Sequence, residues 1–181
     1  MLKLIVEGQE LYDDETSTFS TKETVELELE HSLLSLSKWE SNHLKPFLSA
    51  KDLTRDETFD YVMCMILTPG ITKDMIEHDT VHIVSEVNAY INSPQSATQF
   101  GELPKKRVSG EVITSELIYY WLSAFRINFD PVETWHLNRL FSLIRIANNK
   151  NSPPEKLSRS ERARQMHELN EKRKAENNTR G

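Results

Sequence analysis

The sequence predicts an α+β fold that is mainly α-helical. We expect an N-terminal β-hairpin or small antiparallel sheet packed on a multi-helix domain, with a protruding, charged C-terminal helix. Apolar residues recur with a period of two in the first thirty residues and of about 3.6 from Ser32 onward. A break rich in asparagine and proline then precedes a strongly charged final segment. The predicted parts are a hairpin and helical body, 1–150, and a linker with a helical arm, 151–181.

Two N-terminal segments, 2–6 and 25–29, have the alternation of half-buried strands. Each places leucine or valine at every second position, so that one face is apolar and the other is wet. The residues between them are polar, and we expect a short third strand near 17–20. A hairpin alone is only marginally stable, so its apolar face is predicted to lie on the helices.

Capping and breaking residues mark helices through the rest of the body. Thr54 and Glu57 form a capping box, in which each side chain accepts a hydrogen bond from a backbone N–H of the first turn. Pro46, Gly70 and Pro94 each follow an apolar periodic segment and predict its end. The predicted helices begin at Leu33, Thr54, Thr72 and Thr80, at Thr114 or Ser115, and at Pro131. The loop 95–110, with the basic run 105–107, separates the fourth from the fifth.

The helix predicted over 131–147 has the widest apolar surface. Asp130, Pro131 and Glu133 suit its N-cap, first and third positions. Apolar residues on more than one face predict several neighbouring elements. The expected buried cluster consists of Trp121, Trp135, Leu140 and Ile144.

Trp39 has two interpretations. Tryptophan is enriched among the residues that anchor protein interfaces, which makes Trp39 a candidate partner contact. It also shares a helix face with Leu33 and Leu36, which favours a place in the core. We favour the core and keep the partner contact as the alternative.

The chain closes with a helix predicted over 158–175, opened by a second capping box of Ser158 and Glu161. Its apolar stripe holds only three residues, extended by the stem of one arginine. Such a stripe is too thin for a core but suits a partner's groove or a second copy. The alternative is a solvated tail. The candidate partner-binding residues of the chain are Trp39, Ala163, Met166, Leu169, Arg162 and Arg173.

Charge is distributed unevenly along the chain. The first thirty residues hold nine acids and two lysines, a net charge of −7, whereas residues 150–181 hold nine Lys/Arg and five acids, a net charge of +4. The acidic head and basic tail either attract one another, within a molecule or between copies, or form two separate solvated surfaces. Self-association is therefore one expectation.

Several partners and compartments are disfavoured. The arginines and lysines of the tail are interleaved with glutamates and no aromatic residue lies among them, so we expect no nucleic-acid binding. No apolar run approaches the roughly 20 residues of a membrane span. The single cysteine, Cys64, excludes an internal disulfide and a cysteine-based zinc cluster. A cytosolic location is expected.

No catalytic pattern is recognisable. His78 and His82 have the spacing of a helical metal site, but Asp79 and Thr80 resemble a helix cap, which would leave His78 outside the helix. Cys64 lies between two methionines, as a buried apolar cysteine would. Five glycines provide no phosphate-binding loop. We therefore expect no enzyme activity, no cofactor and no metal.

A resemblance to a known family is carried by the segments 29–33, 37–41, 45–48, 113–116, 118–121, 135–140 and 151–154, together with the basic tail that ends at 178–181. These segments resemble a protein family that tailed bacteriophages and prophages encode in their tail operons. The similar genes lie near the gene of the tape-measure protein.

This resemblance implies a phage tail assembly chaperone. Such a protein would be non-catalytic and would bind the tape-measure protein, or another tail protein, in the host cytoplasm during tail morphogenesis. A long helical client with apolar stripes needs protection from aggregation before the tail tube surrounds it. The alternative is a structural tail or baseplate component of the virion.

Overall fold

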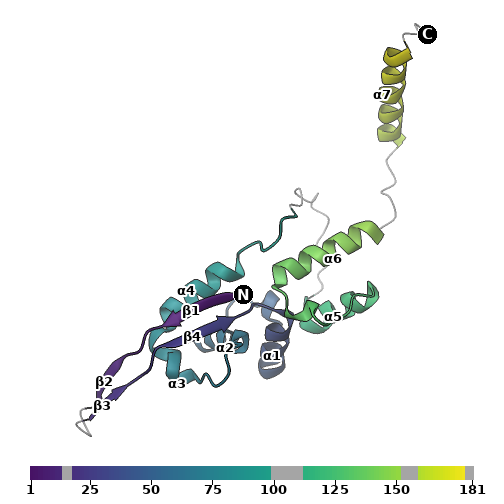
Figure 1. The fold of residues 1–181 in the computed structure, drawn as a ribbon. Helices are drawn as coiled ribbons and strands as arrows, with labels where there is room; N and C mark the ends of the chain where they lie inside the picture. Colours follow the sequence, from purple (N-terminus) through teal and green to yellow (C-terminus); the bar gives the residue numbers. More distant parts are fainter. Residues whose placement is uncertain (14–17, 99–111, 152–158, 178–181) are drawn as a thin grey trace. The chain divides into compact units, whose positions relative to one another are not determined.

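The computed structural model describes residues 1–13, 18–98, 112–151 and 159–177, and it is mainly helical with an N-terminal antiparallel hairpin packed on helices (Figure 1). The chain divides into two compact units, unit 1 (Met1–Ala147) and unit 2 (Asn148–Gly181). The predicted fold class is therefore confirmed for the hairpin and the helices. The predicted loop 95–110 lies mostly outside the described residues.

The hairpin pairs β1 (Leu2–Val6) with β4 (Val25–Leu29) in antiparallel register. Leu4 and Leu27 face each other and are buried, whereas Ile5 on the opposite face is exposed, as the alternation predicted. The chain between them forms a second antiparallel pair, β2 (Glu10–Asp13) and β3 (Thr18–Thr21). The strand predicted near 17–20 corresponds to β3, and β2 was not predicted.

Gly8 stands where the two pairs of strands meet. A Cβ atom at this position would lie 2.2 Å from the carbonyl oxygen of Lys22, so only glycine allows the backbones to approach this closely. The Gly8 N–H also donates to the hydroxyl of Thr24 at 3.1 Å.

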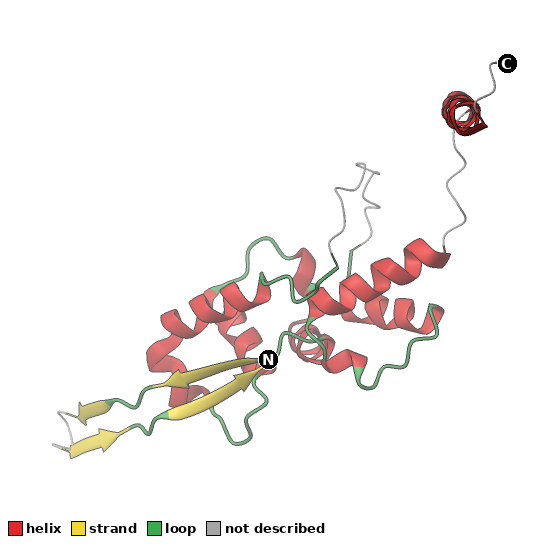
Figure 2. Cartoon of the chain, turned by 45° about the horizontal axis from the view of Figure 1, so that its top comes forward, coloured by secondary structure: helices red, strands yellow, loops and turns green. Residues whose placement is uncertain are grey.

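The apolar face of the hairpin lies on the first helices, and Figures 1 and 2 show α4 beside it. These helices are α1 (Leu33–His43), α2 (Arg55–Met65), the short α3 (Lys73–Ile76) and α4 (Thr80–Ile91), with 3₁₀ turns at 47–49 and 77–79. Side chains from both strands, from α2 and from α4 form the first core cluster. The capping box of Thr54 and Glu57 is present at the start of α2.

A second core cluster consists of helices alone. It lies among α1, α5 (Ser115–Ala124), the 3₁₀ turn η3 (Val132–Thr134) and α6 (Leu137–Asn151). The prediction for this region is partly confirmed. Leu140 and Ile144 are buried there, but Trp121 and Trp135 are only partly buried and pack against the cluster.

The helix predicted over 131–147 was wrong at both ends. Pro131 leads into the 3₁₀ turn, and Trp135 is extended with a ψ of 155°. His136 forms a β-bridge with Ser32, and the Leu137 N–H donates to the His31 carbonyl at 2.8 Å. A helix running from Pro131 would lose this pairing, so α6 begins only at Leu137 and continues past Ala147 to Asn151.

In unit 2 the described residues form the last residues of α6, 148–151, and the helix α7 (Arg159–Asn177). The predicted cap residue Ser158 lies outside the described residues. Within the described part of the chain, no helix is both long enough and apolar enough to cross a lipid bilayer.

Candidate partner-binding surfaces

The apolar stripe of α7 is exposed, as its sequence predicted. Met166 is 64% and Leu169 is 49% exposed, and Ala163 and Arg173 are exposed as well. Arg162 belongs to the same helix, but its side chain is not among those described. The i, i+3 spacing places Met166 and Leu169 side by side on one face. This face is available to an external partner.

Trp39, the other candidate, is not available to a partner. Its side chain is fully buried in the first core cluster. The indole N–H donates to the backbone carbonyl of Glu57 at 2.9 Å, and the ring stacks on His43 with 4.4 Å between centroids. The core interpretation therefore holds. The partner-contact interpretation was wrong, because a partner cannot touch a side chain without exposed surface.

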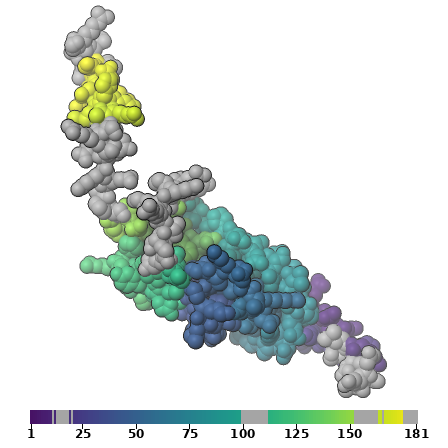
Figure 3. All heavy atoms as spheres, turned by 180° about the vertical axis from the view of Figure 1, so that it is seen from behind, coloured from purple at the N-terminus to yellow at the C-terminus, as the bar shows by residue number. Residues whose placement is uncertain are grey.

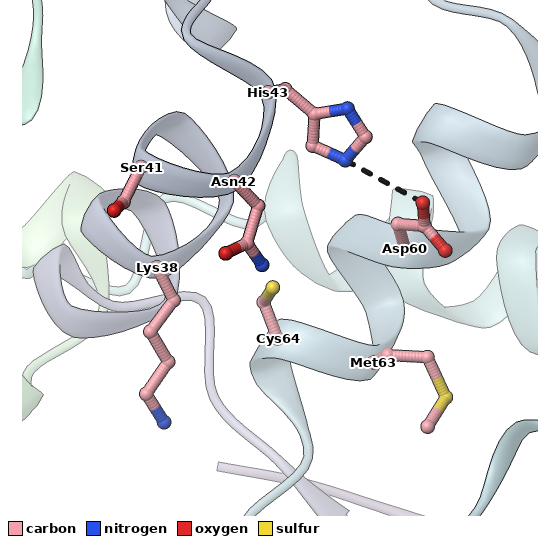
Figure 4. A pocket seen from close by; sticks show the side chains of 7 residues that line it. All are labelled: Lys38, Ser41, Asn42, His43, Asp60, Met63 and Cys64. Carbon is pink, nitrogen blue, oxygen red and sulfur yellow. Dashed lines mark ion pairs between the residues drawn. The ribbon is translucent and has the colours of Figure 1, made fainter.

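A groove of about 740 Å³ lies between α1 and α2 (Figure 4). Figure 4 shows His43 turned toward Asp60, and the two side chains pair with 3.5 Å between Nε2 and Oδ2. Asp60 also lies 3.9 Å from the ammonium of Lys73. The seven lining residues are Lys38, Ser41, Asn42, His43, Asp60, Met63 and Cys64.

The thiol in this groove is poorly suited to nucleophilic chemistry. Burial raises the pKa of Cys64, opposed by the nearby ammonium of Lys38. His43 is stacked on Trp39 and paired with Asp60, and no hydrogen bond joins it to Cys64 among the described contacts. The groove is thus a surface hollow lined by both polar and apolar side chains, in which Asp60 pairs with His43. Cys64 is less buried than its methionine neighbours suggested.

The two histidines with metal-site spacing have other partners. His78 lies outside α4, in a 3₁₀ turn, and its Nε2 is 2.9 Å from the Glu7 carbonyl. His82 pairs through Nδ1 with the carboxylate of Asp79 at 2.9 Å. Asp79 is the N-cap residue of α4, as predicted, although its side chain makes no capping hydrogen bond. The described residues contain no group of three ligands placed to hold a metal ion.

Sequence reasoning missed a buried polar cluster between the hairpin and the helices. Nδ1 of His31 lies 2.6 Å from the Tyr61 hydroxyl, and the rings of His31 and His136 meet edge to face at 5.2 Å. Burial, together with the neighbouring His136, lowers the pKa of His31 to about 3. Burial also lowers the pKa of His136, whose Nε2 is 3.2 Å from the Tyr90 carbonyl. These rings are therefore neutral near pH 7 and belong to the core.

Sequence reasoning also missed an exposed aromatic pair on the β2–β3 ribbon. Tyr12 and Phe19 are direct cross-strand partners with 4.8 Å between ring centroids. Tyr12 is 51% exposed and Phe19 is 74% exposed. The sequence signal was weak, because each ring stands alone in a polar segment and only the strand register brings them together.

Comparisons of the chain with protein-family models, with curated proteins and with solved structures find no match. Two of the surfaces described above expose apolar side chains, namely the stripe of α7 and the aromatic pair of the ribbon.

Proposed function

We propose that this protein is a tail assembly chaperone of a tailed bacteriophage. It acts without catalysis in the host cytoplasm and binds the tape-measure protein, or another tail protein, before the tail tube forms. The observation that carries the proposal is the exposed stripe of α7, together with the sequence resemblance to the tail-operon family. A helix that exposes Met166 and Leu169 in a row offers a helical client an apolar contact.

The charges of α7 support a reversible contact. Arg164, Lys172, Arg173 and Lys174 are exposed on this helix, and its one described ion pair, Lys174 with Glu171, has 3.7 Å between charged atoms. Exposed ion pairs contribute little to stability, so these groups remain available to a partner. Charges around a small apolar stripe accelerate association and set orientation more than they add affinity.

The test is co-expression with the neighbouring tail genes, followed by affinity capture of this protein. Leu169→Asp is expected to reduce capture of the tape-measure protein by about tenfold or more, because it places a charge in the apolar contact. The matched control is His167→Asp, which adds the same charge on the flank of α7 and should retain capture. Equal capture by all three proteins would contradict the assignment of the stripe.

A second measurement separates a chaperone from a structural component. Mass spectrometry of purified virions is expected to miss this protein, because a chaperone leaves once the tail is assembled. Detection at a stoichiometry comparable to that of tail subunits would instead identify it as a tail or baseplate component.

A further inference from the structure

The β2–β3 ribbon exposes an apolar surface that no described element covers. Tyr12 and Phe19 contact each other across the two strands with 51° between their ring planes, and both are more than half exposed. Figure 3 shows the purple atoms of the N-terminal strands at one end of unit 1, beyond the teal helices. An exposed aromatic pair on a two-stranded ribbon is typical of a contact surface, since aromatic rings supply large contact area at low entropic cost.

Exposed acidic residues lie on the ribbon and on the strands that lead to it. Glu10 lies two residues before Tyr12 in the same strand and therefore on the same face of the ribbon. Glu7, Glu23 and Glu26 are also exposed on the N-terminal strands and their connections. None of these four glutamates makes an ion pair with another described residue. The surface therefore suits a partner that combines apolar and cationic side chains.

The helix α7 has these complementary features. Met166 and Leu169 are exposed on one face, and Arg173 follows Leu169 by four residues, so that it extends the same face. Four residues of helix rise by about 6 Å, and two residues of strand span about 7 Å. The distance from Leu169 to Arg173 along the helix thus matches the distance from Tyr12 to Glu10 along the strand.

We propose that the β2–β3 ribbon of one copy binds α7 of a second copy. Met166 and Leu169 pack on the rings of Tyr12 and Phe19, and Arg173 pairs with Glu10. A thioether against an aromatic ring is a favourable contact in its own right. Because each copy carries both surfaces, two copies exchange their helices reciprocally and form a closed dimer. The proposal concerns this chain alone and does not depend on the tail function.

Disulfide trapping between two differently tagged full-length chains tests the geometry. Cys64 is replaced by Ser in both chains, one chain carries Phe19→Cys and the other carries Met166→Cys. Mild oxidation of the mixture is expected to yield the mixed disulfide, identified by intact mass. The matched control pairs Met166→Cys with Tyr120→Cys, because Tyr120 on α5 is also well exposed, at 66%. The Phe19 pair should form the mixed disulfide several-fold faster than the control pair.

Equal rates for the two pairs would overturn the proposal, because they would reflect random collision. So would a disulfide that forms only when both cysteines are in one chain, because the helix would then bind its own ribbon. Trapping in the absence of any tail protein also separates this proposal from the proposed function, which requires a client.

A charge exchange provides the second test, by sedimentation of the purified protein at low salt. Arg173→Glu and Glu10→Lys are each expected to weaken dimerisation about threefold or more, and the two changes combined in one chain should restore it. Both positions are exposed, so folding should be unaffected. A wild-type protein that stays monomeric at tens of micromolar would refute the dimer. So would a combined variant as weak as the single ones.

Discussion

The helices α1 and α7 both have apolar residues spaced three apart, but these side chains are buried on α1 and exposed on α7. Leu33, Leu36 and Trp39 lie three residues apart on α1, and all three are fully buried. Met166 and Leu169 have the same spacing on α7 and remain largely exposed. The periodicity of a helix therefore predicts that an apolar stripe exists, but not what covers it.

The difference lies in the neighbours. Leu33 and Leu36 pack in the second core cluster, whereas Trp39 packs in the first, so α1 joins the two clusters. Elements later in the chain pack against it, among them α2, α5 and η3. The segment that contains α7 has too few apolar residues to form such a cluster around it. The apolar residues of α7 are thus exposed because their own segment has too few apolar residues to cover them. Those of α1 are buried because the tertiary fold brings other elements against them.

The largest expected effect is on the buried side of this comparison. Trp39→Ala should lower the free energy of unfolding by about 3–5 kcal/mol, because it removes a fully buried ring, its stacking on His43 and its hydrogen bond to Glu57. Leu169→Ala should change it by less than about 0.5 kcal/mol, because half of that side chain is already in water. Urea titration of both variants measures the two values. Similar losses of unfolding free energy in the two variants would contradict the view that the apolar residues of α1 are buried and those of α7 are exposed.

The free energy of unfolding should depend on pH through a histidine beside α1, and not through the histidine on α7. His31 directly precedes the N-cap of α1, and its pKa of about 3 lies well below the ordinary value of 6.5. Below pH 6.5 the unfolded chain binds a proton that the folded chain excludes, so stability falls as the pH falls toward 3. For one proton taken up on unfolding, the free energy of unfolding changes by about 1.4 kcal/mol per pH unit. Urea titrations between pH 7 and pH 4 measure this slope.

Two variants serve as comparisons for the pH dependence. His31→Gln removes the titrating ring and should reduce the acid slope, even if its stability at pH 7 is lower. His167→Gln changes an exposed ring on α7 and should leave the slope unchanged. If His31→Gln retained the full slope, another group would be responsible for the acid sensitivity.

A smaller loss is expected at the buried carboxylate of α1. Glu40 is 6% exposed, and its two oxygens accept backbone N–H groups from Phe47 at 3.0 Å and from Ser115 at 2.7 Å. Glu40→Gln replaces one acceptor with a donor, which leaves one buried N–H without a partner. The expected cost is about 1–3 kcal/mol.

On α7 the matched change is Glu168→Gln. It should have almost no effect on stability, because Glu168 is exposed. Thermal unfolding of the two glutamine variants compares them directly. A stable Glu40→Gln protein would mean that the carboxylate oxygens are not both needed.

The smallest effect is expected from removal of the whole arm. Deleting residues 155–181 should shift the unfolding free energy of the remaining protein by less than about 0.5 kcal/mol, while weakening capture of the tail partner or self-association. Calorimetry and affinity capture on the same truncated protein measure both. Much earlier melting would show that the arm packs on the core. Unchanged binding would show that it is only a solvated tail.

Local signals predicted much of this fold because they act within a few residues. The strands 2–6 and 25–29, the capping box of Thr54 and Glu57, and the end of α1 before Pro46 all follow from nearby side chains and backbone preferences. The start of α6 was missed because it depends on pairing with residues 31 and 32, about a hundred positions earlier in the chain. Asp130 and Pro131 form a good local start signal that this long-range pairing overrides.

The candidate surfaces divide in the same way. The sequence by itself determined the exposed stripe of α7, because three apolar residues in a charged helix cannot form a core. It also determined which strand faces are apolar. Only the tertiary structure decided that Trp39 belongs to the core, that His31 and His136 meet, and that Tyr12 and Phe19 share a surface. These outcomes depend on contacts between distant segments, and periodicity records which face of an element is apolar but not which segment will cover it.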